Sequence, residues 1–177
     1  MISKEGKPSL LITILFPMKS IRVKFLRGLI ITGRLPFFWF VLLIWSLTYF
    51  TVALLYFVWA PETRGNEIFS DQDLAHIFFL TCIVAPLFET FLFQSFAIMV
   101  VKKLLSRNIC IQAGISAVLF SLAHLYNGWY VFFTFIIGLV FGTGYIAYYR
   151  RGGFMAFMAI ATAHFLRNLA AFTYNAI

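Results

Sequence analysis

Apolar runs of roughly 20 residues, separated by short polar or basic stretches, dominate the pattern of this chain. They cover about residues 36–60, 74–101, 109–126, 129–149 and 154–177. A run of this length can cross the hydrocarbon core of a bilayer, about 30 Å thick, as one α-helix. The pattern therefore predicts an all-α fold, a polytopic transmembrane helix bundle of about five spans.

The first 34 residues have a different pattern, in which seven Lys and Arg residues are interleaved with short apolar groups. Such a mixture suits an amphipathic segment in the headgroup region, with its cations against anionic lipid. A partly disordered basic leader explains the pattern equally well. We divide the chain into a basic N-terminal interfacial segment, residues 1–34, and a transmembrane helical domain, residues 35–177.

Composition agrees with a membrane protein, since 62% of the 177 residues are hydrophobic and 11% are charged. The net charge of +8 does not indicate a nucleic-acid partner, because no soluble basic face is left to bind one. The cations gather at the N-terminus, after residue 101 and at Arg150-Arg151, and cation-poor loops alternate with these clusters. By the positive-inside rule, we expect the N-terminus in the cytoplasm and the C-terminus on the opposite side, with membrane lipid as a partner.

One acidic residue lies within the apolar runs, Glu89 near the middle of residues 80–101. A charge at the centre of a transmembrane helix costs about 2.5–3.5 kcal/mol on insertion scales, so it persists only where protein or trapped water receives it. His124 and His164 lie in later runs. A rise of about 1.5 Å per residue puts the three groups about 16–22 Å from the cytoplasmic ends of their helices. We therefore expect them at one level of the bilayer.

Two further residues share a helix face with these histidines. Asn168 follows His164 by one helical turn, and Phe120 precedes His124 by one turn. A carboxylate, imidazoles and a carboxamide suffice for hydrolysis, with Glu89 as general base and the other groups holding the water or donating to the oxyanion. Two alternatives remain open. The glutamate and both histidines could bind a divalent metal such as zinc, or each histidine could only satisfy a backbone carbonyl.

Four stretches also carry a resemblance to a known family, and they occur in the order APLFETFLFQSF, SAVLFSLAHLYN, FTFIIGLVFGTG and ATAHFLRNLAAF. In order and spacing they resemble the motifs of the CPBP intramembrane proteases. That family includes CAAX prenyl endopeptidases of the Rce1 type and bacterial bacteriocin-processing or self-immunity proteins. The resemblance covers about residues 75–177. It implies a multi-pass protein of the bacterial plasma membrane, an endopeptidase that hydrolyses a peptide bond of a membrane-associated peptide or protein.

The resemblance also implies roles for single residues. Matched by position, Glu89 corresponds to the family's water-activating glutamate. His124 corresponds to the histidine of the second motif, in which Phe120 also matches, and the pair of the last motif corresponds to His164 and Asn168. The family's mechanism implies that glutamate activates water while histidine and asparagine support the oxyanion.

The chain departs from the family's first motif, Glu-Glu-x-x-x-Arg, at Thr90 and Gln94. Two neutral hydrogen-bonding groups replace a pair of charges there, so local electroneutrality is kept. We hypothesise that Arg167 offsets the charge of Glu89 or binds a substrate carboxylate in place of the missing arginine. Other functions also stay open. One is a catalytically inactive immunity or peptide-binding factor of the same fold, and the other is a transporter or proton-relay subunit, for which the chain lacks inverted repeats.

Overall fold

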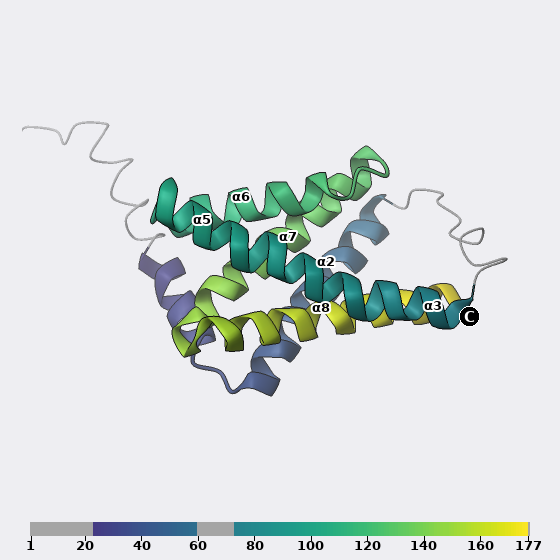
Figure 1. The fold of residues 1–177 in the computed structure, drawn as a ribbon, viewed down its shortest axis with the longest axis horizontal. Coiled ribbons are helices and arrows are strands. Elements are labelled where there is room, and N and C mark those ends of the chain that lie inside the picture. The colour runs from purple at the N-terminus through teal and green to yellow at the C-terminus, as the bar shows by residue number, and fades with distance from the viewer. Residues whose placement is uncertain (1–22, 60–72, 177) are drawn as a thin grey trace, which may run out of the picture.

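The computed structural model describes residues 23–59 and 73–176, and this part of the chain contains helices but no β-strand. One long helical unit combines five successive elements, and Figure 1 shows it running beside the last helix of the chain. The longer elements are α2 (Phe37–Trp59), the unit Leu74–Leu104, α6 (Ile109–Leu122), α7 (Gly128–Tyr148) and α8 (Gly153–Ala176). The predicted all-α fold is confirmed.

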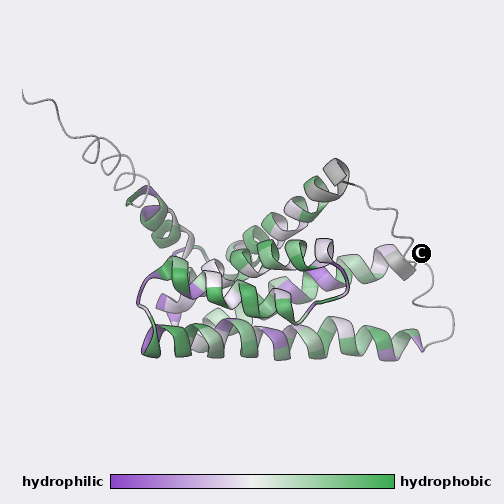
Figure 2. Cartoon of the chain, turned by 90° about the horizontal axis from the view of Figure 1, so that it is seen from above, coloured by the Kyte–Doolittle hydropathy of each residue, from purple (hydrophilic) through white to green (hydrophobic). Residues whose placement is uncertain are grey.

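Four helices of the described residues are long and apolar enough to span a membrane, and they lie within Phe37–Leu54, Leu74–Leu104, Gly128–Arg151 and Gly153–Tyr174. Figure 2 shows hydrophobic residues along most of their length. The chain is therefore a multi-pass integral membrane protein. The third predicted span, about residues 109–126, is shorter than expected, because α6 has 14 residues and a length of about 21 Å.

The shorter third helix has a local cause in the stretch after Leu122. The amide of His124 bonds to the Ser121 carbonyl at 3.0 Å, which closes the helix in a tight turn. Asn127 then begins α7, since its side chain accepts a 2.9 Å hydrogen bond from the Tyr130 amide. The tight turn and the cap at Asn127 leave residues 123–126 outside both helices, although the apolar pattern assigned them to the end of a span.

Helices α6 and α7 form a hairpin with close backbone contact. A Cβ atom added at Gly138 would lie 2.9 Å from Cα of Ala117 and 3.2 Å from Cδ1 of Phe120. The same element carries Gly142 four residues later, so small residues line the side of α7 that faces α6. This contact brings Phe120, and with it the end of α6, against the centre of the bundle.

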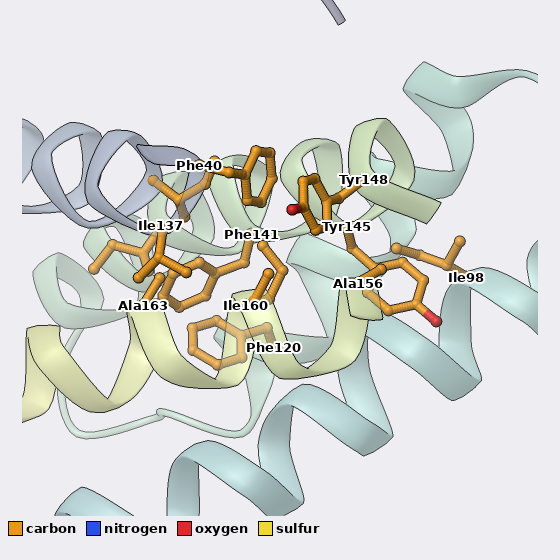
Figure 3. Packing of buried hydrophobic residues seen from close by; sticks show 13 residues of the cluster. Phe40, Ile98, Phe120, Ile137, Phe141, Tyr145, Tyr148, Ala156, Ile160 and Ala163 are labelled. Atoms are coloured by element: carbon orange, nitrogen blue, oxygen red, sulfur yellow. The ribbon is translucent and has the colours of Figure 1, made fainter. Parts of the chain in front are cut away.

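The core lies where α2, α6, α7 and α8 meet, as Figure 3 shows. Phe40 of α2 stacks on Tyr148 of α7 with ring centroids 4.1 Å apart. Alanines of α8, among them Ala159 and Ala163, are fully buried and let the larger side chains of the other helices approach. Phe141 belongs to this cluster and also contacts the candidate site described below.

Arg151, just after α7, ties the N-terminal part of the described chain to the bundle. Its guanidinium donates to the carbonyls of Gly33 and Arg34, at 3.2 and 2.6 Å, and stacks over the Tyr148 ring. Residues 23–32 before this junction form a helix. The rest of the predicted interfacial segment, residues 1–22, and residues 60–72 of the predicted polar loop lie outside the described residues.

Candidate active site

Glu89 ends α4 (Ala85–Glu89), between the π-helical segments η1 (Phe79–Val84) and η2 (Thr90–Phe96). Pro86 has no N–H and disturbs the helix that precedes it. The Ala85 amide bonds to the Leu80 carbonyl, five residues back, so the wider π pattern replaces the α pattern here. The sequence pattern predicted one plain helix through this region, and the π segments are a difference, of which the first has a visible cause at Pro86.

Each π segment leaves a carbonyl that another helix satisfies. Thr81 has lost its α-helical donor, and its carbonyl accepts a 2.9 Å hydrogen bond from Nδ2 of Asn168 on α8. The Phe93 carbonyl likewise accepts from Oγ of Ser116 on α6 at 2.7 Å, because the Ala97 amide bonds elsewhere. The helix that carries the glutamate is therefore held on both sides by side chains of α6 and α8.

The carboxylate of Glu89 faces both predicted histidines. Its Oε2 lies 3.7 Å from Nε2 of His124 and 3.7 Å from Nε2 of His164. Both distances exceed a direct hydrogen bond, which for these atoms is about 2.7–3.2 Å. The side chain of Glu89 is 21% exposed, that of His124 15% and that of His164 4%. Glu89 and His124 are therefore partly accessible from outside the bundle, whereas His164 is enclosed.

Phe120 is the side chain against which both imidazoles pack. Its ring centroid lies 4.7 Å from that of His124 and 5.8 Å from that of His164. Its backbone carbonyl is 2.7 Å from Nδ1 of His124, which fixes the orientation of that ring. Phe141 covers His164 from α7 at 4.9 Å between ring centroids. The predicted supporting position of Phe120 is thus at the centre of the site.

These groups line a cavity of about 50 Å³. It has room for water molecules but not for a peptide segment. Glu89 and both histidines line it together with Arg167 and Asn168 from α8. The guanidinium of Arg167 donates to Oδ1 of Asn168 at 3.2 Å. Among the described residues, the ion-pair partners of the glutamate are the two histidines, so any balancing of its charge by Arg167 acts across the cavity.

Three lining residues were missed by the sequence reasoning, namely Tyr130, Thr134 and Ile137 of α7. The Tyr130 ring lies 5.8 Å from that of His124. Thr134 donates to the Tyr130 carbonyl at 2.8 Å, so its hydroxyl is already engaged within the helix. The spacing of Tyr130 and Thr134 could have indicated them, since polar groups four residues apart in an apolar run lie on one helix face.

Thr90 and Gln94 do not line this cavity, although they were predicted to support it. Both side chains are fully buried. The Thr90 hydroxyl and both polar atoms of the Gln94 amide have no hydrogen-bond partner among the described residues. The expected charge-neutral pair of hydrogen-bonding groups is present, but the two groups are not bonded to each other.

A metal site would need three donor side chains around one ion. No group of three or more His, Cys, Asp or Glu side chains has the arrangement of a metal site in the part of the chain that the structure describes. The Glu89 carboxylate approaches both imidazoles through a single oxygen, at the distances given above. On this finding we derive no step through a metal.

Comparison with known proteins matches the chain to a family model. The family model of type II CAAX prenyl endopeptidases, Rce1-like, matches residues 71–170, which include every residue of the cavity. Neither the curated proteins nor the solved structures give a match. The matched part is more than half of the chain and has the helical, membrane-spanning character of an intramembrane protease. The chain therefore belongs to the Rce1-like family of type II CAAX prenyl endopeptidases.

Proposed function

We propose that this protein is an intramembrane endopeptidase in which Glu89 activates a water molecule for attack on a peptide bond. The observation that carries the proposal is the equal 3.7 Å approach of its Oε2 to Nε2 of His124 and of His164. A water oxygen at about 2.8 Å from each of these atoms fits such a separation. Family membership supports a peptide or protein substrate at the membrane.

The hydrogen bond of His124 supports different roles for the two imidazoles. The Phe120 carbonyl can only accept, so Nδ1 of His124 carries the proton and Nε2 of the neutral ring is an acceptor. That Nε2 can orient the water. Nδ1 of His164 has no hydrogen-bond partner among the described residues, so its ring can carry the proton on Nε2. There it can donate to the developing oxyanion.

The reaction then has two stages. Glu89 takes a proton from the water, the water oxygen bonds to the carbonyl carbon, and the π electrons of the C=O bond move to its oxygen. The oxyanion accepts hydrogen bonds from His164 and from the second N–H of the Asn168 amide, since the first is bound to Thr81. The C–N bond then breaks, and the protonated glutamate gives its proton to the leaving nitrogen. The products are a carboxylic acid and an amine.

The test uses the full chain reconstituted in proteoliposomes with a library of membrane-tethered peptides, some with prenylated C-termini and some unmodified. Cleavage is read by mass spectrometry in water labelled with heavy oxygen, which enters the new carboxyl group. We expect Glu89→Gln to lower cleavage by a factor of about 10²–10⁴. Lys24→Gln, an exposed position outside the cavity, should leave it unchanged.

The same experiment addresses the inactive alternative, which the uncharged Thr90 and Gln94 favour. Peptides that are retained without cleavage by both the wild type and Glu89→Gln would indicate an immunity or peptide-binding factor. Cleavage of equal rate in both proteins would show that the glutamate is not the base.

We also propose that the N-terminus lies in the cytoplasm of a bacterial cell and the C-terminus across the plasma membrane. The basic connection between α5 (Ala97–Leu104) and α6 supports this orientation. Cys110, at the start of α6, is exposed, whereas Cys82 is buried. A membrane-impermeant maleimide should therefore label Cys110 from the cytoplasmic side of inverted vesicles and not from outside intact cells.

A further inference from the structure

A second and larger cavity lies away from the glutamate and is lined mainly by residues of α5, α6 and α7 and of the segments that follow α5 and α7. Its volume is about 640 Å³, and it shares no lining residue with the cavity of the candidate active site. Apolar side chains such as Ile98 and Ile146 form part of its wall. Three hydroxyl-bearing residues, Ser95, Tyr145 and Tyr149, line it as well.

Four cations line this cavity, and they come from three different segments. Lys102 and Lys103 end α5, Arg107 lies in the following connection, and Arg150 follows α7 in η3 (Tyr149–Arg151). No carboxylate lines the cavity, and no ion pair involves these cations within the described residues. Lys102 is held over the Tyr149 ring, with its Nζ 5.1 Å from the ring centroid. Four positive charges without a counter-charge repel one another, so an anion in their midst is favoured.

The neighbouring Arg151 differs from these four cations, because its guanidinium is bonded within the fold. Its guanidinium is engaged by the carbonyls of Gly33 and Arg34 and by the Tyr148 ring. Among the described residues Arg150 makes no such contacts, and it lines the cavity instead. Of two consecutive arginines, one therefore holds the fold together and the other faces a space that can take a ligand.

An apolar groove adjoins the cationic cavity. It has a volume of about 310 Å³ and shares Ile109, Ile146 and Arg150 with the larger space. Its other wall comes from the helix of residues 23–32, through Leu26 and Leu29. A ligand that is anionic at one end and apolar along its length matches the two spaces together.

We infer that this double cavity binds one anionic phospholipid, with the phosphate among Lys102, Lys103, Arg107 and Arg150 and an acyl chain in the groove beside Leu26 and Leu29. A cation-lined pocket between helices at the end of their spans is suited to a lipid phosphate. The binding energy has two sources, which are charge attraction at the cations and apolar contact along the groove. This lipid site does not depend on the proposed peptidase chemistry.

The test measures which lipids stay bound to the purified full chain. The protein is reconstituted in nanodiscs of phosphatidylcholine and phosphatidylglycerol, extracted into mild detergent, and analysed by native mass spectrometry. We expect the protein to retain more phosphatidylglycerol than phosphatidylcholine. The ratio of the two retained lipids should fall about fivefold for each cation removed in Arg107→Gln and Arg150→Gln. The double variant Lys24→Gln with Arg27→Gln removes two exposed cations that do not line the cavity, and its ratio should be unchanged.

Two further measurements distinguish a bound lipid from a bound free anion and control for misfolding of the variants. Inorganic phosphate alone should not raise the melting temperature of the detergent-purified protein, whereas added phosphatidylglycerol should. A rise with phosphate of the same size would overturn the lipid in favour of a soluble anion. The pair Arg107→Lys and Arg150→Lys, which keeps the charges, should retain the lipid and shows that the positions tolerate substitution.

An equal loss of lipid in the Lys24 and Arg27 control, or no preference in the wild type, would refute the site. Glu89→Gln should keep the lipid ratio of the wild type, because the glutamate lies outside the cavity. Failure of the peptidase proposal and failure of the lipid proposal therefore give different results.

Discussion

Nδ2 of Asn168 donates a 2.9 Å hydrogen bond to the backbone carbonyl of Thr81, which ties α8 to the helix of the candidate base. The Ala85 amide, which would bond this carbonyl in an α-helix, bonds Leu80 instead. The next amide in a π pattern belongs to Pro86, which has no hydrogen to donate. Asn168 therefore completes the backbone of a neighbouring helix, in addition to any part it takes in the proposed reaction.

This bond predicts that Asn168 affects stability as well as activity. Asn168→Ala leaves the Thr81 carbonyl without its donor, so we expect the free energy of unfolding to fall by about 1–3 kcal/mol. Cleavage should fall as well. Denaturant unfolding in detergent, followed by tryptophan fluorescence, measures the first effect. Thr162→Val is the control on the same helix, since within the described residues the Thr162 hydroxyl bonds to the Met158 carbonyl of its own helix and to no other helix. Unchanged stability of Asn168→Ala would contradict the structural role.

Two amide variants can separate the roles of the nitrogens of His124. His124→Asn keeps a donor near the Nδ1 position, which can still bond the Phe120 carbonyl, but it removes Nε2. We expect a near-normal melting temperature with cleavage lowered by a factor of about 10² or more. His124→Gln places its amide near the Nε2 position and gives up the bond to the carbonyl. It should lose about 1 kcal/mol of stability. Equal behaviour of the two variants in both assays would contradict the assigned tautomer.

The close contact of α6 and α7 predicts different outcomes for two glycine substitutions. A methyl group at Gly138 would lie 2.9 Å from Cα of Ala117, which is backbone that cannot move aside alone. We expect Gly138→Ala to cost about 1–3 kcal/mol of stability and to reduce cleavage, because it displaces Phe120. Gly114→Ala on α6 meets no atom within 4 Å and is the matched control, expected to be neutral or stabilising. Thermal unfolding in detergent distinguishes the two.

Thr90 and Gln94 predict a coupling that a double-mutant cycle can measure. Both are fully buried, so Thr90→Glu alone should place an unpaired charge in the bundle and cost about 3–5 kcal/mol. Gln94→Arg alone should be similarly harmful. The double variant restores the charges of the family's first motif, and we expect it to be more stable than the sum of the single changes implies. Additive costs would show that the two positions do not pair in this fold.

The sequence by itself was sufficient for the class of fold and for the candidate residues. An apolar run long enough to cross a bilayer forms a helix, because a helix satisfies the backbone hydrogen bonds of the run without water. A buried carboxylate is costly, so Glu89 was expected to be near polar groups at a similar depth. The structure brings His124, His164 and Asn168 to the same cavity. Their catalytic roles remain predictions.

Only the tertiary structure decided how the site is built. A sequence pattern contains helix periodicity but not which carbonyl of one helix meets which side chain of another, so the bond from Asn168 to Thr81 was not foreseen. The same holds for Tyr130, which reaches the cavity through the packing of α7. Thr90 and Gln94 are fully buried but do not line the cavity, and the sequence pattern did not indicate this either. Contacts between helices depend on rotation and register, and these are set by how all the side chains pack together.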